Sequence, residues 1–284
     1  MFNEGKALTL REMQLVELDI LKDFKAICDR YGLVYNLIGG TLLGAIRHGG
    51  FIPWDDDIDV SMPKPDCDVL VELYKSGVFP KHLKLCAYSL GNFERPFMKI
   101  VDTRTVVRNE KNYLQDGNAE GLWIDVIPVS GVPADERLRR KLYNRSHLLY
   151  KLICLSKANL GTGATVGRMI VKSVVAIFAK MFGTRFWLNR IEKMMAKYPY
   201  EESDFVGELC FSYSGVKNSM PRSEYLDQTE VMFEGMYCKT FRQWDADLTR
   251  IFGDYMTLPP ENERKKHNIQ AWKVEDRFVE QNQK

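Results

Sequence analysis

The stretch that most constrains this 284-residue chain is GGTLLGAIRHGGFIPWDDDIDVSM, residues 39–62. It places a glycine pair before a short helical run and then packs four aspartates into residues 55–59. The segment from Ile58 to Met62 is typical of a β-strand, and alternate strand residues face the same side. Asp57 and Asp59 should therefore project together, and carboxylates held so close repel unless a cation joins them.

A third aspartate, Asp125, interrupts the otherwise apolar segment GLWIDVIPV, residues 121–129. Buried carboxylates are rare unless paired or metal-bound, so Asp125 either meets a cation or lies at a strand end facing water. Carboxylate oxygens favour Mg²⁺ or Mn²⁺ over zinc. Gly39 and Gly40 precede a helix, where backbone N–H groups and the helix dipole attract phosphate. Together these features predict a metal-assisted phosphoryl-transfer site.

Three other interpretations of the acidic stretch fit less well. A calcium loop starting at Asp55 would need glycine where Val60 stands, and it would carry prolines at its ninth and eleventh positions. An aspartyl-phosphate phosphatase needs a hydrophobic strand before its nucleophile, whereas Trp54-Asp55-Asp56 precedes Asp57. A solvated acidic loop explains Asp55 and Asp56 but not the flanking glycines and apolar residues. Asp55 and Asp56 are accordingly interpreted as loop-shaping.

The rest of the chain alternates helical and strand patterns. Thr9 and Glu12 form a capping box ahead of an amphipathic helix that Gly32 should end. Short strands are expected at residues 33–38, 82–88, 96–102 and 121–129, and helices from 135 to 198. We therefore divide the chain into a core at 1–133, a basic helical insert at 134–200, and a C-terminal part at 201–284 that completes the core.

The insert carries a strong charge asymmetry. Residues 137–197 contain 14 Lys or Arg and one acid, Glu192, so this segment has a net charge of +13 while the whole chain has +2. Such one-sidedness indicates an anionic partner, although a solvated helical face is the alternative. An apolar stripe from Ile170 to Met181, flanked by Lys172 and Lys180, favours core packing by itself. Together with the charge, it makes peripheral membrane contact an equal alternative.

Composition points to an ordinary globular protein of a reducing compartment. The N-terminus has no signal-peptide pattern, and we find no apolar run of about 20 residues. The six cysteines stand far apart with no C-x-x-C pair, which is typical of free thiols. We expect a cytoplasmic location, at most peripheral at the inner face of the cytoplasmic membrane. The basic segment shows no zinc or RRM-like signature, so nucleic acid is not expected as a partner.

Several blocks of the sequence resemble one family. The stretch at 39–62, followed in order by RPFMKIVDTRT, GLWIDVIPVSGVP, FEGMYCKTFRQWDADLTRIFGDYMTLPP and ENERKKHN, is similar to the LicD family, which includes bacterial phosphocholine transferases and relatives of the fukutin-related protein. The resemblance implies an α+β fold of the polymerase-beta nucleotidyltransferase type, with a mixed sheet flanked by helices. It also implies a metal triad of Asp57, Asp59 and Asp125.

The family typically moves a phospho-alcohol group, often phosphocholine from CDP-choline, onto a sugar hydroxyl of a surface glycan. By this resemblance Asp57 and Asp59 hold Mg²⁺, and Asp125 completes the site or accepts the proton of the attacking hydroxyl. Arg47 and Lys99 would neutralise phosphoryl charge, although a surface salt bridge is the alternative for each. The remaining candidates are Gly39, Gly40 and Thr41 for phosphate, and His48 and His267 as ambiguous polar groups. If the head group is choline, Trp54 and Trp123 are candidate aromatic faces for it, although core packing is the favoured alternative for each.

The expected partners are a CDP-alcohol donor and an anionic or lipid-linked glycan acceptor near the membrane surface. Two other functions remain open. A nucleotidyltransferase that releases pyrophosphate would use the same three acids, and the released product distinguishes it. A non-catalytic glycan- or membrane-binding module is disfavoured because all three acids are present.

Overall fold

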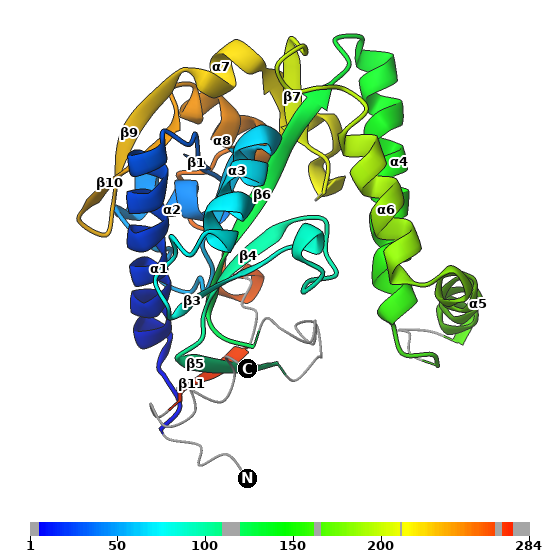
Figure 1. Cartoon of the computed structure of the whole chain (residues 1–284), viewed down its shortest axis with the longest axis horizontal. Helices are drawn as coiled ribbons and strands as arrows, with labels where there is room; N and C mark the ends of the chain where they lie inside the picture. Colours follow the sequence, from blue (N-terminus) through cyan, green and yellow to red (C-terminus); the bar gives the residue numbers. More distant parts are fainter. Residues whose placement is uncertain (1–5, 110–119, 162–165, 211, 265–268, 275–284) are drawn as a thin grey trace. The chain divides into compact units, whose positions relative to one another are not determined.

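The structure is a computed structural model that describes residues 6–109, 120–161, 166–210, 212–264 and 269–274 (Figure 1). The chain forms two compact units, the first from 1–93, 97–127 and 226–284, and the second from 94–96 and 128–225. Helices and a mixed sheet occur together, which confirms the predicted α+β class. The three-part division at residues 133 and 200, drawn from composition, stays a prediction.

Helix α1, Leu10–Tyr31, forms as its local sequence predicts. The Thr9 side chain accepts a hydrogen bond from the Glu12 N–H, and the Glu12 carboxylate accepts one from the Thr9 N–H at 2.7 Å. Gly32 ends the helix at φ +68°, a left-handed conformation that costs glycine little. The inner side of α1 is almost entirely apolar, and this makes a fully buried acid on it, Glu17, conspicuous.

The sheet of the first unit places strand β6 at its centre. The strands follow the order β1 (Asn36–Leu37), β2 (Asp59–Pro63), β6 (Trp123–Val132), β4 (Met98–Asp102) and β3 (Leu83–Cys86). The pairs β1–β2, β4–β6 and β3–β4 are antiparallel. Strand β1 has only two residues, fewer than the segment 33–38 predicts, whereas the other four predicted strands appear with shifted ends.

Helices and two hairpins complete the first unit. Helix α2 (Gly39–His48) joins β1 to β2, and α3 (Lys64–Lys75) follows β2. The antiparallel pair β9 (Gln228–Phe233) and β10 (Met236–Phe241) packs on β1 and α2. The pair β5 (Thr105–Asn109) and β11 (Ile269–Lys273) lies beside the lower end of α1 in Figure 1, and α8 (Trp244–Phe252) contacts α2.

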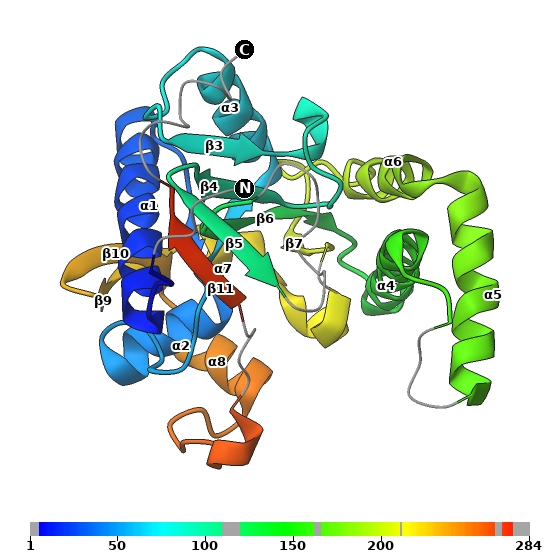
Figure 2. The ribbon, with the colours of Figure 1, turned by 90° about the horizontal axis from the view of Figure 1, so that it is seen from below.

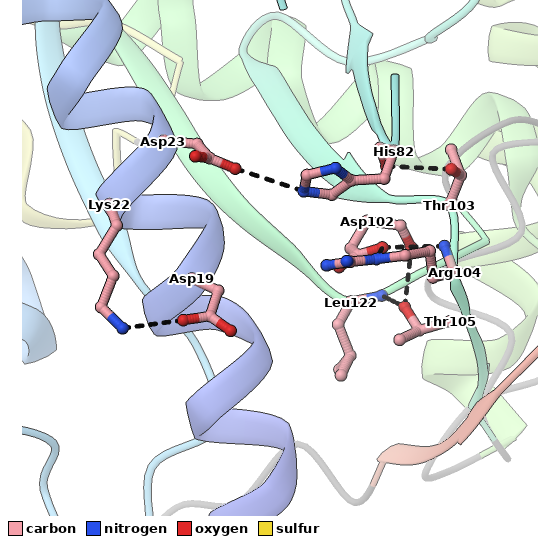
Figure 3. A network of polar contacts seen from close by, with 9 residues as sticks. All are labelled: Asp19, Lys22, Asp23, His82, Asp102, Thr103, Arg104, Thr105 and Leu122. Atoms are coloured by element: carbon pink, nitrogen blue, oxygen red, sulfur yellow. Dashed lines mark hydrogen bonds and ion pairs between the residues drawn. The ribbon is translucent and has the colours of Figure 1, made fainter. Parts of the chain in front are cut away.

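A polar network fixes the turn after β4, the strand that carries Lys99 (Figure 3). Asp102 is 1 % exposed and accepts hydrogen bonds from the backbone and the guanidinium of Arg104. This pairing raises the pKa of Arg104. The Thr105 hydroxyl donates to the Asp102 carbonyl and accepts from the Leu122 N–H, both at 2.8 Å. The network therefore fastens the end of β4 to the start of β6.

The second unit is mainly helical, which confirms the prediction for residues 135–198. It contains α4 (Glu136–Lys157), α5 (Val166–Phe182) and α6 (Thr184–Met195), with short elements at Ser212–Asn218 and Arg222–Leu226. Residues 129–132 of β6 pair with β7 (Phe205–Glu208), and β7 pairs with β8 (Ser219–Pro221).

All six cysteines are free, as their spacing predicts. Within the described residues, every helix is too short or too polar to cross a lipid bilayer.

Candidate active site

The sheet brings the predicted acids onto neighbouring strands. The Asp125 N–H on β6 donates to the carbonyl of Ile58 at 2.8 Å, and Ile58 lies between Asp57 and Asp59. Strand β2 begins at Asp59, so Asp57 precedes the first paired residue instead of lying within the strand. The alternation persists in burial, because Ile58 is buried whereas Asp57 and Asp59 are partly exposed.

The glycine pair lies directly against this acidic segment. Gly39 has φ +56°, and a Cβ placed on it would lie 3.6 Å from a carboxylate oxygen of Asp59. A Cβ on Gly40 would lie 2.8 Å from a carboxylate oxygen of Asp55, closer than real Cβ contacts. The Thr41 hydroxyl accepts a hydrogen bond from the Asp59 N–H at 2.8 Å. The start of α2 thus positions Asp59, and its predicted role in holding phosphate stays a prediction.

Lys99 lies between an acid and an aromatic ring. It is the cross-strand partner of Asp125, its ammonium is 3.2 Å from Asp125 Oδ1, and its side chain is 7 % exposed. The same ammonium lies 3.7 Å from the centre of the Trp123 ring, an attractive cation–π geometry. The two predicted residues Lys99 and Trp123 therefore meet at Asp125, and Lys99 offsets the charge of that carboxylate.

The donor chemistry of the three acids fits a hard divalent cation, since carboxylate oxygens are its preferred ligands. Among the described residues, no three His, Cys, Asp or Glu side chains are gathered into a metal-binding group. Asp57, Asp59 and Asp125 nonetheless lie at one place in the sheet, on β6 and at the start of β2. Metal binding by these residues stays a prediction.

The structure adds Glu17, which the sequence analysis did not select. Glu17 is 0 % exposed, and neither carboxylate oxygen has a hydrogen-bond partner among the described residues. Burial, reinforced by the nearby charges of Asp57, Asp56, Asp55 and Asp125, raises its pKa well above the ordinary value. The signal was present in the sequence, because position 17 falls on the buried side of α1 between Met13 and Ile20.

Gln14, one turn before Glu17, joins the same helix to the acidic turn. Its side chain is 4 % exposed and donates to the Asp55 carbonyl at 2.8 Å. An amide on the buried side of a helix needs such a partner. Gln14 therefore fixes the approach of α1 to the acids.

The remaining candidates form a second group around Trp54. The Arg47 guanidinium donates to His48 Nε2 at 3.0 Å and to the Tyr255 carbonyl at 2.7 Å. Burial and the charge of Arg47 lower the pKa of His48. His48 lies edge-on to Trp54, and Arg264 lies over the Trp54 ring at 4.3 Å. Both tryptophans proposed for choline thus already contact a cationic side chain of the protein, Arg264 at Trp54 and Lys99 at Trp123. His267 lies outside the described residues.

A carboxylate from the C-terminal hairpin holds the segment that leads into the acids. Glu234, at φ +50°, accepts from the Phe51 N–H at 3.2 Å and pairs with Arg11 at 2.6 Å. These contacts lower the pKa of Glu234, the Arg11 bond most. A Cβ on Gly50 would lie 2.3 Å from the same carboxylate, so a larger residue there would displace the Glu234 side chain.

Comparison with known proteins identifies the family of this chain. Residues 32–112, which include α2, β2 and β4, match the family described as LicD/FKTN/FKRP, nucleotidyltransferase domain. The chain is also 33 % identical over 274 residues to the lipopolysaccharide cholinephosphotransferase LicD of Haemophilus influenzae, covering 93 % of this chain and 98 % of that protein. The chain belongs to the LicD family, as its sequence blocks indicate.

Two uncharacterized proteins of Rickettsia match shorter parts. The one from Rickettsia typhi is 33 % identical over 87 residues, 29 % of this chain and 26 % of its own length. The one from Rickettsia prowazekii is 31 % identical over 110 residues, 38 % of this chain and 36 % of its own length.

Proposed function

We propose that this protein transfers phosphocholine from CDP-choline to a sugar hydroxyl of a lipopolysaccharide or a lipid-linked glycan precursor and releases CMP. The similarity to the Haemophilus cholinephosphotransferase, 33 % identity over nearly the full length of both chains, supports phosphocholine as the transferred group and lipopolysaccharide as the acceptor class. The observation that carries the chemistry is the hydrogen bond from the Asp125 N–H to the Ile58 carbonyl, which sets a third acid beside Asp57 and Asp59.

In the proposed reaction, the acceptor hydroxyl oxygen attacks the phosphorus that bears choline. A new P–O bond forms, the bond to the CMP phosphate oxygen breaks with its electron pair, and the hydroxyl proton passes to a carboxylate. Asp57, Asp59 and Asp125 would hold Mg²⁺ or Mn²⁺, which supplies charge neutralisation at the donor pyrophosphate when bound. Asp125 alternatively accepts the proton, and Lys99 would stabilise charge on the transferred phosphoryl group.

The direct test incubates the full chain with CDP-choline, Mg²⁺ and a choline-free lipopolysaccharide and follows CMP release by chromatography. CDP-ethanolamine, CDP-glycerol and CDP-ribitol tested in parallel define the head group. We expect CMP release that depends on the acceptor and stops with EDTA. Pyrophosphate released from a nucleoside triphosphate, with no turnover of any CDP-alcohol, would instead establish a nucleotidyltransferase.

The variants Asp57→Asn and Asp59→Asn test the role of the acids. Each should lower the rate of transfer by at least about a hundredfold, because each removes charge from a preorganised site. The matched control is Asp19→Asn on α1, an exposed aspartate that pairs with Lys22 of the same helix at 2.8 Å. Full activity in Asp57→Asn and Asp59→Asn would contradict the assignment.

A further inference from the structure

Helix α5 of the second unit directs its large apolar side chains outward. Six of them are 49–78 % exposed, and they are named here as the α5 apolar face: Ile170, Val171, Val174, Ile177, Phe178 and Met181. The buried side of the helix carries small residues instead, with Ala176 and Ala179 at 1 % and 0 %. The stripe, for which periodicity by itself favours core packing, is therefore on the surface of this unit.

The α5 apolar face is continuous. At 3.6 residues per turn, its six side chains fall within an arc of about 120°, with Lys172 and Lys180 outside it. Phe182 extends the face at its C-terminal end, where its ring stacks on Phe186 at 4.9 Å. Apolar patches of this kind on a single chain mark interaction sites.

Contacts with α6 fix the position of α5 within its unit. The Trp187 ring N–H on α6 donates to the Ala179 carbonyl at 2.9 Å, and Phe178 and Phe182 contact the same ring at 6.0 and 5.5 Å. In Figure 1 and Figure 2, α5 stands at the outer edge of the three helices of its unit. Packing through alanines and one tryptophan fixes the helix, while its branched side chains and Met181 remain exposed and Phe178 is only half covered.

The charge around this face selects its partner. Exposed basic side chains lie on α5 and on the following helix α6, at Lys180, Arg185, Arg190 and Lys193, within the +13 segment. A second copy of the chain would bring two such segments together, and like charges repel. An anionic lipid surface instead attracts the basic residues and receives the apolar ones.

We propose that the α5 apolar face inserts into an anionic phospholipid bilayer, with the exposed lysines and arginines of α5 and α6 at the lipid headgroups. The helix then lies in the interface plane and does not cross the membrane. This inference is independent of the proposed transfer chemistry, because its test measures binding alone.

The test is sedimentation of the full chain with vesicles of phosphatidylcholine alone, or with one third phosphatidylglycerol. Val174→Asp and Met181→Asp place a charge in the centre of the face, at positions 62 % and 78 % exposed. The matched control is Val69→Asp on α3, where the valine is 45 % exposed. Circular dichroism verifies that all variants are folded.

We expect salt-sensitive binding to the anionic vesicles, about tenfold weaker in each α5 variant and unchanged in Val69→Asp. Equal binding of wild type and α5 variants would overturn the proposal, as would no binding at low salt. Self-association that Val174→Asp abolishes, without vesicle binding, would assign the face to a second copy and overturn it as well.

Discussion

Glu17→Gln is the substitution whose effect the structure defines most sharply. Glu17 is completely buried, and burial together with the acids around it raises its pKa well above 4.5. The folded protein therefore keeps this carboxyl protonated above pH 4.5, whereas the unfolded chain releases the proton there. The stabilising effect of protonation is fully present below pH 4.5 and is lost as the pH rises toward the raised pKa.

The magnitude follows from this proton balance. One proton released on unfolding changes the free energy of unfolding by about 1 kcal/mol between pH 5 and pH 6. Over that interval wild type should therefore lose about 1 kcal/mol more stability than Glu17→Gln, whose amide does not titrate. Urea titrations followed by tryptophan fluorescence suit the measurement, since four of the five tryptophans lie in the first unit.

Glu12→Gln on the same helix is the control, because the pKa of Glu12 is shifted in the opposite direction from that of Glu17. Hydrogen bonds from Thr9 lower the pKa of Glu12, so its stabilising effect is present above pH 4.5 and is lost only at lower pH. The difference between wild type and Glu12→Gln should thus stay constant from pH 5 to 6. EDTA in all samples removes divalent cations. Parallel pH profiles for wild type and Glu17→Gln would show that Glu17 is ionised when folded and would refute the reasoning.

Two further substitutions test the contacts around the acids, both by urea denaturation. Lys99→Met removes the ammonium 3.2 Å from Asp125 and should cost about 3 kcal/mol, since a buried charge then loses its counterion. The double variant Lys99→Met/Asp125→Asn should recover most of this loss, and a further loss would contradict the pairing. Thr41→Val removes the acceptor of the Asp59 N–H and should cost about 1–2 kcal/mol, whereas Thr41→Ser should remain close to wild type. A loss in Thr41→Ser with none in Thr41→Val would assign the effect to packing of the methyl group.

Local signals made part of this fold predictable. The capping box at Thr9 and the stop at Gly32 define α1, because both are set by residues within one turn of the helix end. The helical content of 135–198 follows from periodicity in the same way. Strand β1 is shorter than predicted, since its pairing partner on β2 matches only Asn36 and Leu37. The number of residues that pair depends on the neighbouring strand, and no local pattern records it.

The site required long-range information. Asp125 was selected as an acid in an apolar run, but only the sheet order places it beside Ile58. Glu17 lies on the apolar side of α1 by its helical spacing, but that spacing does not show that the acids of another segment lie against it. Trp54 was assigned to choline, although Arg264, 210 residues away in the chain, lies over its ring. Met181 belongs to an apolar stripe whose helical spacing is confirmed, but periodicity does not reveal whether another part of the chain covers the stripe.

The anchoring of the acidic turn by Glu234 has a consequence for synthesis on the ribosome. Glu234 contacts Phe51, 183 positions earlier, and Arg11, 223 positions earlier. At about 5–20 residues per second, roughly 10–40 s pass between translation of Phe51 and of Glu234. During that interval the nascent N-terminal segment lacks the carboxylate that holds Gly50 and Phe51. The acidic turn therefore reaches its native geometry late, after the hairpin of β9 and β10 has emerged.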